Sequence, residues 1–226
     1  MSNKIAYRRI QEADLPQLLV WRNDPDVARH MYTDHTITPE EHAAWFARIQ
    51  QNPTASYWII LLDDLPVGLA NVVDIDFDTK GATWAFYLAD ASTRGKGVGL
   101  FTEYCVLECT FGYWGLDVLR CEVLETNPDV CAMHESVGFA RTGRLTARVT
   151  KAGRAIDAIT YAMTNKEWRE VHKPALEARL KSKKRDPLPL LSILESREAE
   201  EQLSTQFNSS MDAEIAEMRA NPSKIL

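Results

Sequence analysis

The sequence has 226 residues, of which 45% are hydrophobic and 26% charged, so it describes an ordinary globular protein with room for one domain and an appendage. A net charge of −6 argues against nonspecific binding to nucleic acid, and we expect any anionic ligand to be held by local donors. No apolar run approaches the ~18 residues of a membrane span, and the first residues form no apolar leader, so we expect a cytoplasmic protein with no membrane contact.

The first half of the chain predicts one strand, two helices and three further strands. A strand is expected over residues 4–10 and a helix over 12–27, where apolar residues recur at helical spacing. Thr38 and Glu41 form a capping box that starts a second helix over 38–52, with Pro39 in its first turn. Strand-like runs over 56–63, 66–76 and 81–90 are separated by turn residues, which predicts an antiparallel meander.

The second half predicts two helices, a strand and a hairpin. A helix is expected over residues 100–115, ended by Gly115, and a short apolar strand over 118–125. Asn127 and Pro128 open another helix over 127–139, and the chain then turns at residues 151–153 in a hairpin. Helices that follow the meander predict an α+β domain.

Cysteine and histidine spacing gives no sign of a metal site. None of the four cysteines forms a CxxC pair, and no histidine cluster has zinc spacing, so we expect no metal. Cys105 and Cys109 lie four residues apart on a predicted helix and are interpreted as core residues.

The end of the chain differs in composition from the rest. Residues 166–226 hold 11 basic and 11 acidic residues, and most of them have a polar helical pattern. We predict a domain over residues 1–168 and a charged, mainly helical extension over 169–226, which is either a solvated tail or an interaction arm.

The sequence RGKGVG, residues 94–99, stands between a predicted strand and a predicted helix. Glycines allow the backbone to approach a ligand closely, and a helix start offers unpaired N–H groups and a partial positive charge. This arrangement favours a bound phosphate, although a structural glycine turn would give the same pattern. The GxxxxGK[ST] spacing of a P-loop is absent, and the antiparallel strands before the loop do not match a Rossmann unit.

The loop resembles the pyrophosphate-binding motif R/Q-x-x-G-x-G/A of the GNAT acetyltransferases, with Arg94, Gly97 and Gly99 at its fixed positions. The segment 127–139 resembles a second signature of that family, N-x-x-A-x-x-L-Y-E-K-x-G-F. The resemblance covers residues 5–163 and implies the GNAT fold: a mixed, mostly antiparallel sheet splayed between its two central parallel strands, with helices on both faces.

The resemblance also implies acetyl-CoA as cosubstrate, bound between the splayed strands 82–89 and 119–125. It implies that backbone groups of Leu88 and Ala89 pair with the pantetheine arm, and that Asn127 touches it from the other strand. It further implies that the pyrophosphate is held by the loop residues Arg94, Gly95, Lys96, Gly97, Val98 and Gly99.

Two residues are candidates for proton transfer. His134 stands where the family usually places a tyrosine acid, so it is either the acid that protonates the departing thiolate or a residue with a structural or cofactor-contact role. Glu122 lies in a strand interior and either organises a water for deprotonation of the amine or is a solvent-facing, salt-bridged residue.

A narrower resemblance, to the amino-sugar acetyltransferases of pseudaminic acid biosynthesis in flagellin glycosylation, rests on residues 21–38, YWII, ATWAFYL, CEVLETN and MHESVGF. Those enzymes acetylate the 4-amine of UDP-4-amino-4,6-dideoxy-N-acetyl-β-L-altrosamine. The segment 29–35 combines cationic, aromatic and imidazole groups, as a nucleotide-sugar pocket requires. The candidate acceptor contacts are Trp21, Arg29, His30, Met31, Tyr32, His35 and Trp84. Core roles for Trp21, Met31 and Trp84, and surface roles for the histidines, are the alternatives.

Two other functions stay open at this point. The acceptor could be a protein N-terminus or a polyamine, and the three carboxylates of residues 74–78 would suit a polyamine. The chain could also be a non-catalytic acyl-CoA-binding module whose extension docks a partner. A homodimer is plausible for this family.

Overall fold

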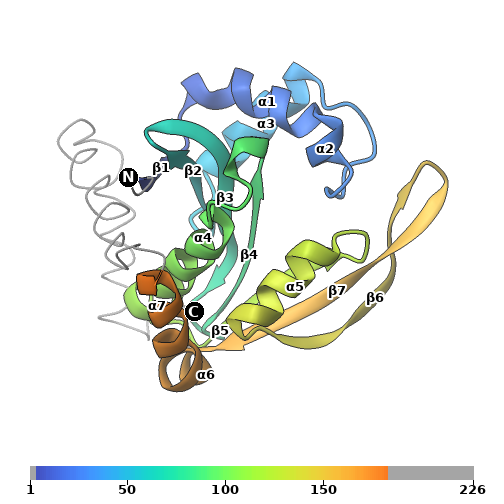
Figure 1. Ribbon diagram of the computed structural model, residues 1–226. Helices are drawn as coiled ribbons and strands as arrows, with labels where there is room; N and C mark the ends of the chain where they lie inside the picture. Colours follow the sequence, from blue (N-terminus) through green and yellow to red (C-terminus); the bar gives the residue numbers. More distant parts are fainter. Residues whose placement is uncertain (1–3, 183–226) are drawn as a thin grey trace.

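A seven-stranded sheet in the order β1-β2-β3-β4-β5-β7-β6 forms the centre of the molecule. The structure, a computed structural model, describes residues 4–182 (Figure 1). The strands are β1 (Ile5–Arg9), β2 (Ser56–Leu62), β3 (Leu65–Asp76), β4 (Gly81–Leu88), β5 (Val118–Leu124), β6 (Ala140–Lys151) and β7 (Arg154–Thr164). Only β4 and β5 pair in parallel. The predicted α+β fold with a mixed, mostly antiparallel sheet is confirmed.

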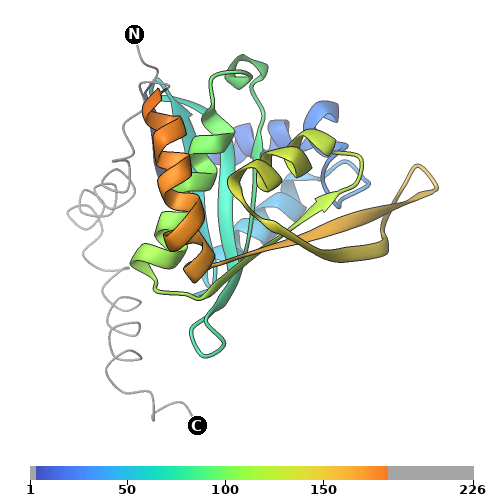
Figure 2. The ribbon, with the colours of Figure 1, turned by 60° about the horizontal axis from the view of Figure 1, so that its bottom comes forward.

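Helices cover both faces of the sheet, as Figure 2 shows. The α-helices are α1 (Leu15–Asn23), α2 (Pro25–Ala28), α3 (Pro39–Gln50), α4 (Val98–Leu107), α5 (Pro128–Val137), α6 (Asn165–Glu167) and α7 (Lys173–Ser182). The 3₁₀ turns are η1 (Glu12–Asp14) and η2 (Ala91–Thr93), and the π-helical segments are η3 (Glu108–Tyr113) and η4 (Trp168–His172). Within residues 4–182, none of these helices has the length and apolarity needed to cross a bilayer.

The helix predicted over residues 12–27 is interrupted in the structure. Asp24 is extended, with φ −63° and ψ 128°, because the residue before a proline avoids the helical region. Its side chain then accepts from the N–H of Asp26 and starts α2. The predicted capping box of α3 is confirmed, since Glu41 N–H donates to the Thr38 hydroxyl and Thr38 N–H donates to the Glu41 carboxylate.

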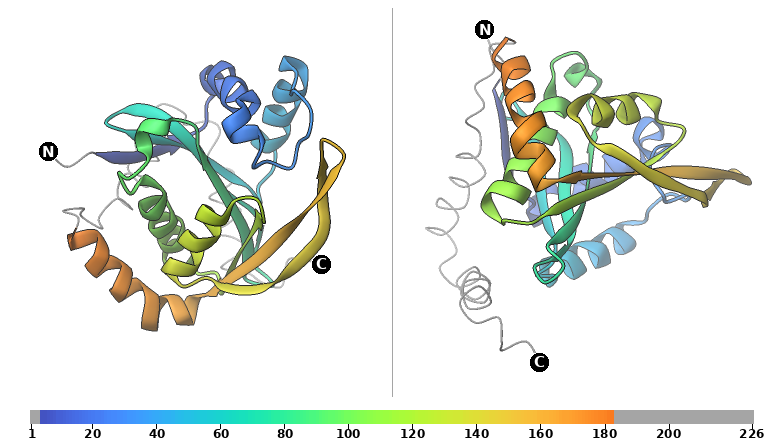
Figure 3. Two further views of the ribbon diagram at one scale, coloured as in Figure 1. Left: turned by 45° about the vertical axis from the view of Figure 1, so that its right-hand side comes forward. Right: turned by 90° about the horizontal axis from the view of Figure 1, so that it is seen from below.

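The parallel strands β4 and β5 separate soon after they begin. They pair only at Gly81↔Val118, Ala82↔Leu119 and Thr83↔Arg120, whereas β4 continues to Leu88 and β5 to Leu124. Both views in Figure 3 show the second half of β4 diverging from β5 and from the long β6–β7 hairpin. The diverging part of these two strands is where the resemblance places acetyl-CoA.

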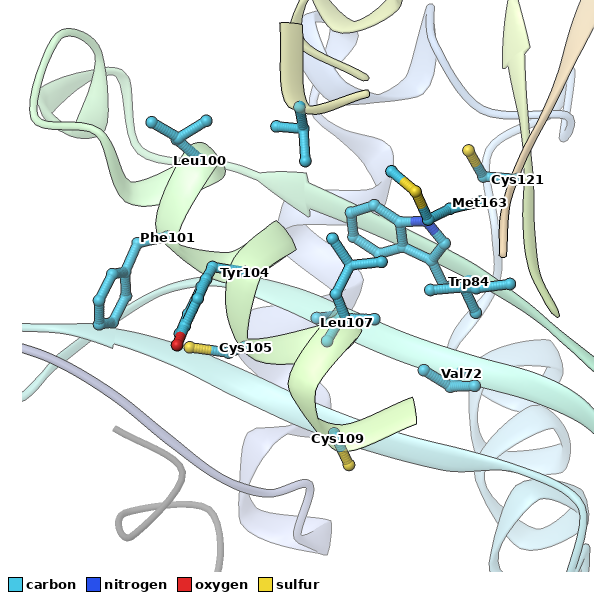
Figure 4. Close-up of a cluster of buried hydrophobic side chains, with 14 of the residues drawn as sticks. Val72, Trp84, Leu100, Phe101, Tyr104, Cys105, Leu107, Cys109, Cys121 and Met163 are labelled. Atoms are coloured by element: carbon cyan, nitrogen blue, oxygen red, sulfur yellow. The ribbon is translucent and has the colours of Figure 1, made fainter. Parts of the chain in front are cut away.

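Successive side chains of a strand point to opposite faces of the sheet, so a separate core forms on each face. On one face, Ile59 of β2 and Leu69 of β3 pack with Leu18 of α1. On the other face, Trp58 and Ile60 belong to the main core around α4. Every residue of α4 except Gly99 is buried, so this mainly apolar helix is enclosed on all sides (Figure 4). Cys105 and Cys109 are buried there and form no disulfide with another cysteine of residues 4–182, which confirms their core role.

The helical segment after β7 belongs to the same core. Trp168, Leu176 and Leu180 are buried in the main cluster. The indole Nε1 of Trp168 donates to Glu108, 2.8 Å away, and the Tyr104 hydroxyl lies 3.0 Å from Glu177. The boundary at residue 168 therefore stays a prediction, while residues 169–182 already pack on the domain. Residues 183–226 of the predicted extension lie outside the described residues.

Candidate active site

The glycine-rich loop lies directly before α4, at the diverging end of β4. Gly95 and Gly97 adopt left-handed backbone angles, φ 73° and 70°, which favour glycine. Gly97 is the N-cap of α4 and offers no side-chain acceptor to the first turn of the helix. The N–H groups of a helix's first turn have no partner within the helix, so this end of α4 fits an anionic ligand. Arg94 and Lys96 lie on the same loop.

The backbone of β4 turns alternate amides toward the open edge of the strand. The N–H of Ala89 donates to the carbonyl of Val67 on β3, 2.9 Å away. The prediction that the Ala89 amide contacts the pantetheine arm is therefore wrong, because this N–H is already bonded inside the sheet. In an antiparallel ladder, successive residues point their N–H and C=O groups in opposite directions. The backbone N–H and C=O of Leu88 therefore point away from β3, toward the side where β5 diverges.

Helix α5 faces the loop from the β5 side. A Cβ on Gly99 would lie 3.1 Å from the sulfur of Met133, so this glycine allows the two helices to approach. Asn127 is the N-cap of α5, yet its side chain makes no cap hydrogen bond. Its amide is therefore not used to stabilise the helix, which agrees with the predicted role as a pantetheine contact.

His134 is buried between α5, α4 and the sheet, and 3% of its side chain is exposed. Its Nδ1 lies 2.7 Å from Oε1 of Glu103, a fully buried carboxylate on α4. Sequence analysis did not assign Glu103. The signal was present as a single acidic residue inside the apolar run 98–107.

Trp84 does not line a pocket. It is 1% exposed, stacks on Phe86 with ring centroids 5.4 Å apart, and meets the edge of His134 at 5.3 Å. The prediction that Trp84 contacts the substrate is wrong, because this residue of β4 points into the main core shown in Figure 4. The alternative core role is the one that the structure shows.

Glu122 of β5 meets two residues from distant parts of the chain. The Tyr32 hydroxyl donates to its Oε2 at 2.5 Å, and Nε of Arg148, on β6, donates to the same oxygen at 3.0 Å. The Arg148 guanidinium also lies 5.0 Å from the centre of the Tyr32 ring, within cation–π range. Burial and the bond to Glu122 raise the pKa of Tyr32 to about 12, so the phenol stays protonated as a donor.

The remaining candidates of segment 29–35 have separate surroundings. Arg29 is exposed, pairs with Asp26 at 3.3 Å and donates to the His30 ring. Burial lowers the pKa of His30, as do Arg29 and Lys151. His35 is exposed and contacts Glu41 at 3.1 Å, on the start of α3. The structure thus brings Tyr32 to Glu122 but leaves His35 beside the α3 cap.

Trp21 and Met31 are partly buried. The Trp21 ring meets Tyr87 of β4 edge-on, with centroids 6.5 Å apart. Trp21 also packs against the smaller core beside α1. Both predictions for these two residues, a core role and a contact with the acceptor, therefore stay open.

Arg22, next to Trp21, was not assigned from the sequence. Burial lowers the pKa of its guanidinium, and within residues 4–182 its hydrogen bonding is limited to a long contact of 3.4 Å to the Thr33 hydroxyl. Tyr87, close enough to interact electrostatically with Arg22, has a buried hydroxyl with no partner among the described residues. The sequence signal was a cation placed inside the apolar pattern of α1.

Lys151 at the tip of β6 ties the hairpin to the same segment. Its ammonium donates to the carbonyls of Ala28 at 2.6 Å and Thr33 at 3.0 Å. Burial lowers its pKa and so does nearby Arg22, while Asp34 opposes them. Arg22, Tyr32, Glu122, Arg148 and Lys151 bridge β4 and β5 where the two strands have separated. We call these five residues the acceptor cluster, after the role proposed for them below.

Residues 4–140 match the acetyltransferase (GNAT) domain family. The chain belongs to this family. Acetyltransferase PseH of Campylobacter jejuni is 24% identical over 133 residues, which cover 59% of this chain and 81% of that protein. An uncharacterized N-acetyltransferase, YokL of Bacillus subtilis, is 24% identical over 170 residues, covering 74% and 94%. Spermidine N-acetyltransferase from Vibrio cholerae, solved with CoA and spermine, has a TM-score of 0.68 at 16% identity and covers 74% of this chain and 98% of that one.

The GNAT chain is therefore an N-acetyltransferase, and its fold supports acetyl-CoA as the cosubstrate. The α4 N-terminus fits the pyrophosphate of that molecule. The loop before it is open at Gly95, where an added Cβ would meet no atom within 4 Å. Among residues 4–182, no group of three or more His, Cys, Asp or Glu side chains is placed to bind a metal.

Proposed function

We propose that this GNAT enzyme acetylates the amine of a nucleotide-linked amino sugar, specifically the 4-amine of UDP-4-amino-4,6-dideoxy-N-acetyl-β-L-altrosamine. The observation that carries the proposal is Arg22, a partly buried guanidinium without a carboxylate partner in residues 4–182. A buried charge is costly unless it is paired, so a ligand of opposite charge is the natural partner. The diphosphate of a sugar nucleotide has that charge, and the similarity to PseH supports the same class.

A polyamine acceptor is less well supported by the same region. The carboxylates that would suit it, in residues 74–78, lie at the end of β3 and in the turn that follows, where Asp76 accepts from the N–H groups of Asp78 and Thr79. This turn precedes β4, whereas the glycine loop follows it (Figure 1). Near the cluster, the charge of Glu122 is already shared by Arg148 and Tyr32.

The donor side would use the loop and both strand ends. The N–H groups of the three loop glycines and of Val98 hold the pyrophosphate, and the backbone of Leu88 and the amide of Asn127 contact the pantetheine arm. The predicted amide contacts of Arg94 and Lys96 are withdrawn, because their N–H groups already donate to the carbonyls of Ala91 and Thr93, each at 3.1 Å. The Arg94 and Lys96 side chains add long-range attraction to a molecule that carries several negative charges. The protein's overall net charge of −6 makes such local attraction necessary.

The transfer needs one proton removed and one supplied. The amine nitrogen attacks the thioester carbonyl, a C–N bond forms, and the C–S electron pair leaves on sulfur. The amine proton passes to Glu122 through a water, and the sulfur takes a proton from His134. Tyr32 and Arg148 orient the Glu122 carboxylate, since both donate to the same oxygen.

The acceptor class is tested by release of free CoA thiol from acetyl-CoA. The purified full chain is offered the UDP-4-amino sugar, spermidine and a peptide with a free N-terminus in parallel. Turnover confined to the sugar nucleotide supports the proposal. Turnover confined to spermidine or the peptide overturns it, and tight acetyl-CoA binding without any turnover indicates a binding module instead.

Arg22→Ala tests the observation itself. Loss of a charge-assisted contact of roughly 1.5–3 kcal/mol should raise the KM for the sugar nucleotide about 10- to 100-fold and leave the KM for acetyl-CoA unchanged. Arg48→Ala is the matched control, because Arg48 is an exposed arginine near the end of α3. An unchanged acceptor KM in Arg22→Ala would remove the main support for an anionic acceptor.

A further inference from the structure

Glu103 is a carboxylate in the middle of an apolar helix. It is fully buried on α4, where its neighbours Phe101, Tyr104 and Cys105 are core residues. Burial of an ionisable group in such a place is unfavourable unless the group has a partner. Its one hydrogen-bonded partner within residues 4–182 is Nδ1 of His134, at 2.7 Å from Oε1.

The pair sits among aromatic rings. His134 has ring centroids of Trp84, Phe139 and Tyr161 at 5.3, 5.4 and 5.8 Å. In the described part of the chain, Oε2 of Glu103 and Nε1 of Trp84 are both buried without a hydrogen-bond partner. A packing role alone would be served as well by an apolar pair of similar volume. The contact therefore points to a role in proton chemistry.

We propose that Glu103 is a positioning residue for His134, which fixes the imidazole through Nδ1 and leaves Nε2 as the nitrogen that exchanges a proton with the departing sulfur. The inference rests on the proposed transfer reaction with His134 as the acid. A carboxylate bonded to Nδ1–H sets the tautomer of a histidine and stabilises its protonated form. When the C–S bond breaks, the proton on Nε2 moves to sulfur, the thiol forms, and His134 becomes neutral until it takes a proton from solvent.

Other ionisable groups face this pair from each neighbouring element. From β7, the Tyr161 hydroxyl donates to Glu135 at 3.0 Å, and burial raises the pKa of that phenol. From β5, Cys121 is buried near Glu103, and burial raises the pKa of its thiol. From α7, Arg179 acts electrostatically on Glu103.

The guanidinium of Arg179 donates to the carbonyl of Ser136, near the end of α5. Arginine keeps its charge across the working range of pH, and a phenol or thiol with a raised pKa stays protonated there. A change in the pH profile that appears in a Glu103 variant and is absent from a matched control can therefore be assigned to the contact between Glu103 and His134.

The test is the pH dependence of kcat in Glu103→Gln, measured with whichever amine the wild-type enzyme acetylates. Glutamine keeps the size of the side chain but removes the charge that stabilises imidazolium. We expect kcat to fall about 10- to 100-fold, both KM values to stay within about twofold, and the alkaline limb of the profile to move to lower pH. The proposal would be overturned if Glu103→Gln had the same kcat and the same pH profile as the wild-type enzyme.

Glu108→Gln is the matched control. Glu108 follows α4 directly and is bonded to Lys173 and Trp168, away from His134. This variant should lose thermal stability and keep the pH profile. A shift of the profile in Glu108→Gln equal to that in Glu103→Gln would overturn the proposal, because the effect would then be general.

A second measurement does not depend on a folded variant. The nitrogen chemical shifts of His134 in the wild-type protein, assigned by comparison with His134→Ala, report its tautomer. The neutral form of His134, which is the form left after the proton on Nε2 has been donated, should carry its remaining proton on Nδ1. A neutral form protonated on Nε2 alone would overturn the proposal. Full activity of His134→Ala would overturn it as well. If the acceptor assay excluded the sugar nucleotide, the tests of Glu103 would still apply. The pH profile can be measured with any amine that the enzyme acetylates, and the nitrogen shifts require no acceptor.

Discussion

The two halves of the candidate site are built in different ways. Apart from Asn127, the proposed donor side consists of consecutive residues, from Leu88 to Gly99, and uses mainly backbone groups at the start of α4. The acceptor cluster joins side chains from α1, the loop after α2, β5 and β6, and its residues are up to 129 positions apart, from Arg22 to Lys151. Backbone donors are independent of side-chain identity, so the first half suits a constant cosubstrate. Side chains determine what the second half binds.

Gly97→Val should have the largest effect and act on the donor side alone. A β-branched residue at φ 70° is strained, and it would displace the first amides of α4 from the pyrophosphate. We expect the KM for acetyl-CoA to rise about 100-fold, as for loss of two or so charge-assisted contacts. Gly153→Val at the hairpin tip, φ 75°, is the control for strain. Equal effects of both variants would contradict a ligand role.

Glu122→Gln should act on the acceptor side and on chemistry. A neutral amide cannot take the proton of the attacking amine, and it binds Arg148 more weakly. We expect kcat to fall at least about tenfold, with the KM for acetyl-CoA unchanged. Steady-state kinetics at saturating acetyl-CoA measure this. A normal kcat would leave Glu122 as a salt-bridged residue only.

Lys151→Met should have a smaller effect, because Lys151 acts through the backbone carbonyls of the segment that carries Tyr32. The two bonds to the carbonyls of Ala28 and Thr33 are lost, and the hairpin tip is no longer tied to the segment that carries Tyr32. We expect the acceptor KM to rise several-fold, about 1 kcal/mol, without a change in the acetyl-CoA KM. Lys80→Met is the control, because Lys80 is an exposed lysine beside Asp117 at the opposite turn.

The smallest effect concerns His42 on α3. Burial lowers the pKa of His42 below its ordinary value of 6.5, and nearby Arg22 lowers it further. The unfolded chain therefore binds this proton more readily, so stability from His42 is present above pH 6.5 and is lost as the pH falls through the lower folded value. Urea unfolding at pH 7.5 and 5.5 should show a smaller loss in His42→Gln than in wild type. An equal loss would contradict this assignment.

The same contrast explains what could be predicted from the sequence. The glycine loop and the α3 capping box are local patterns, and the structure shows each at the predicted residues. Glu122 and Tyr32 were both named from the sequence, but their contact across 90 residues required the fold. Arg22, Arg148 and Glu103 were missed, because their importance lies in burial and in partners from other elements. Trp84 was misplaced because period-two alternation alone does not say which face of β4 is covered.

The most direct test of two separate half-sites is a double-mutant cycle of Gly97→Val and Arg22→Ala, with both KM values measured for each protein. The account predicts that Gly97→Val raises only the KM for acetyl-CoA, that Arg22→Ala raises only the KM for the sugar nucleotide, and that the two effects add within about 0.5 kcal/mol in the double variant. It would be contradicted if Arg22→Ala changed the KM for acetyl-CoA and left the KM for the acceptor as in wild type.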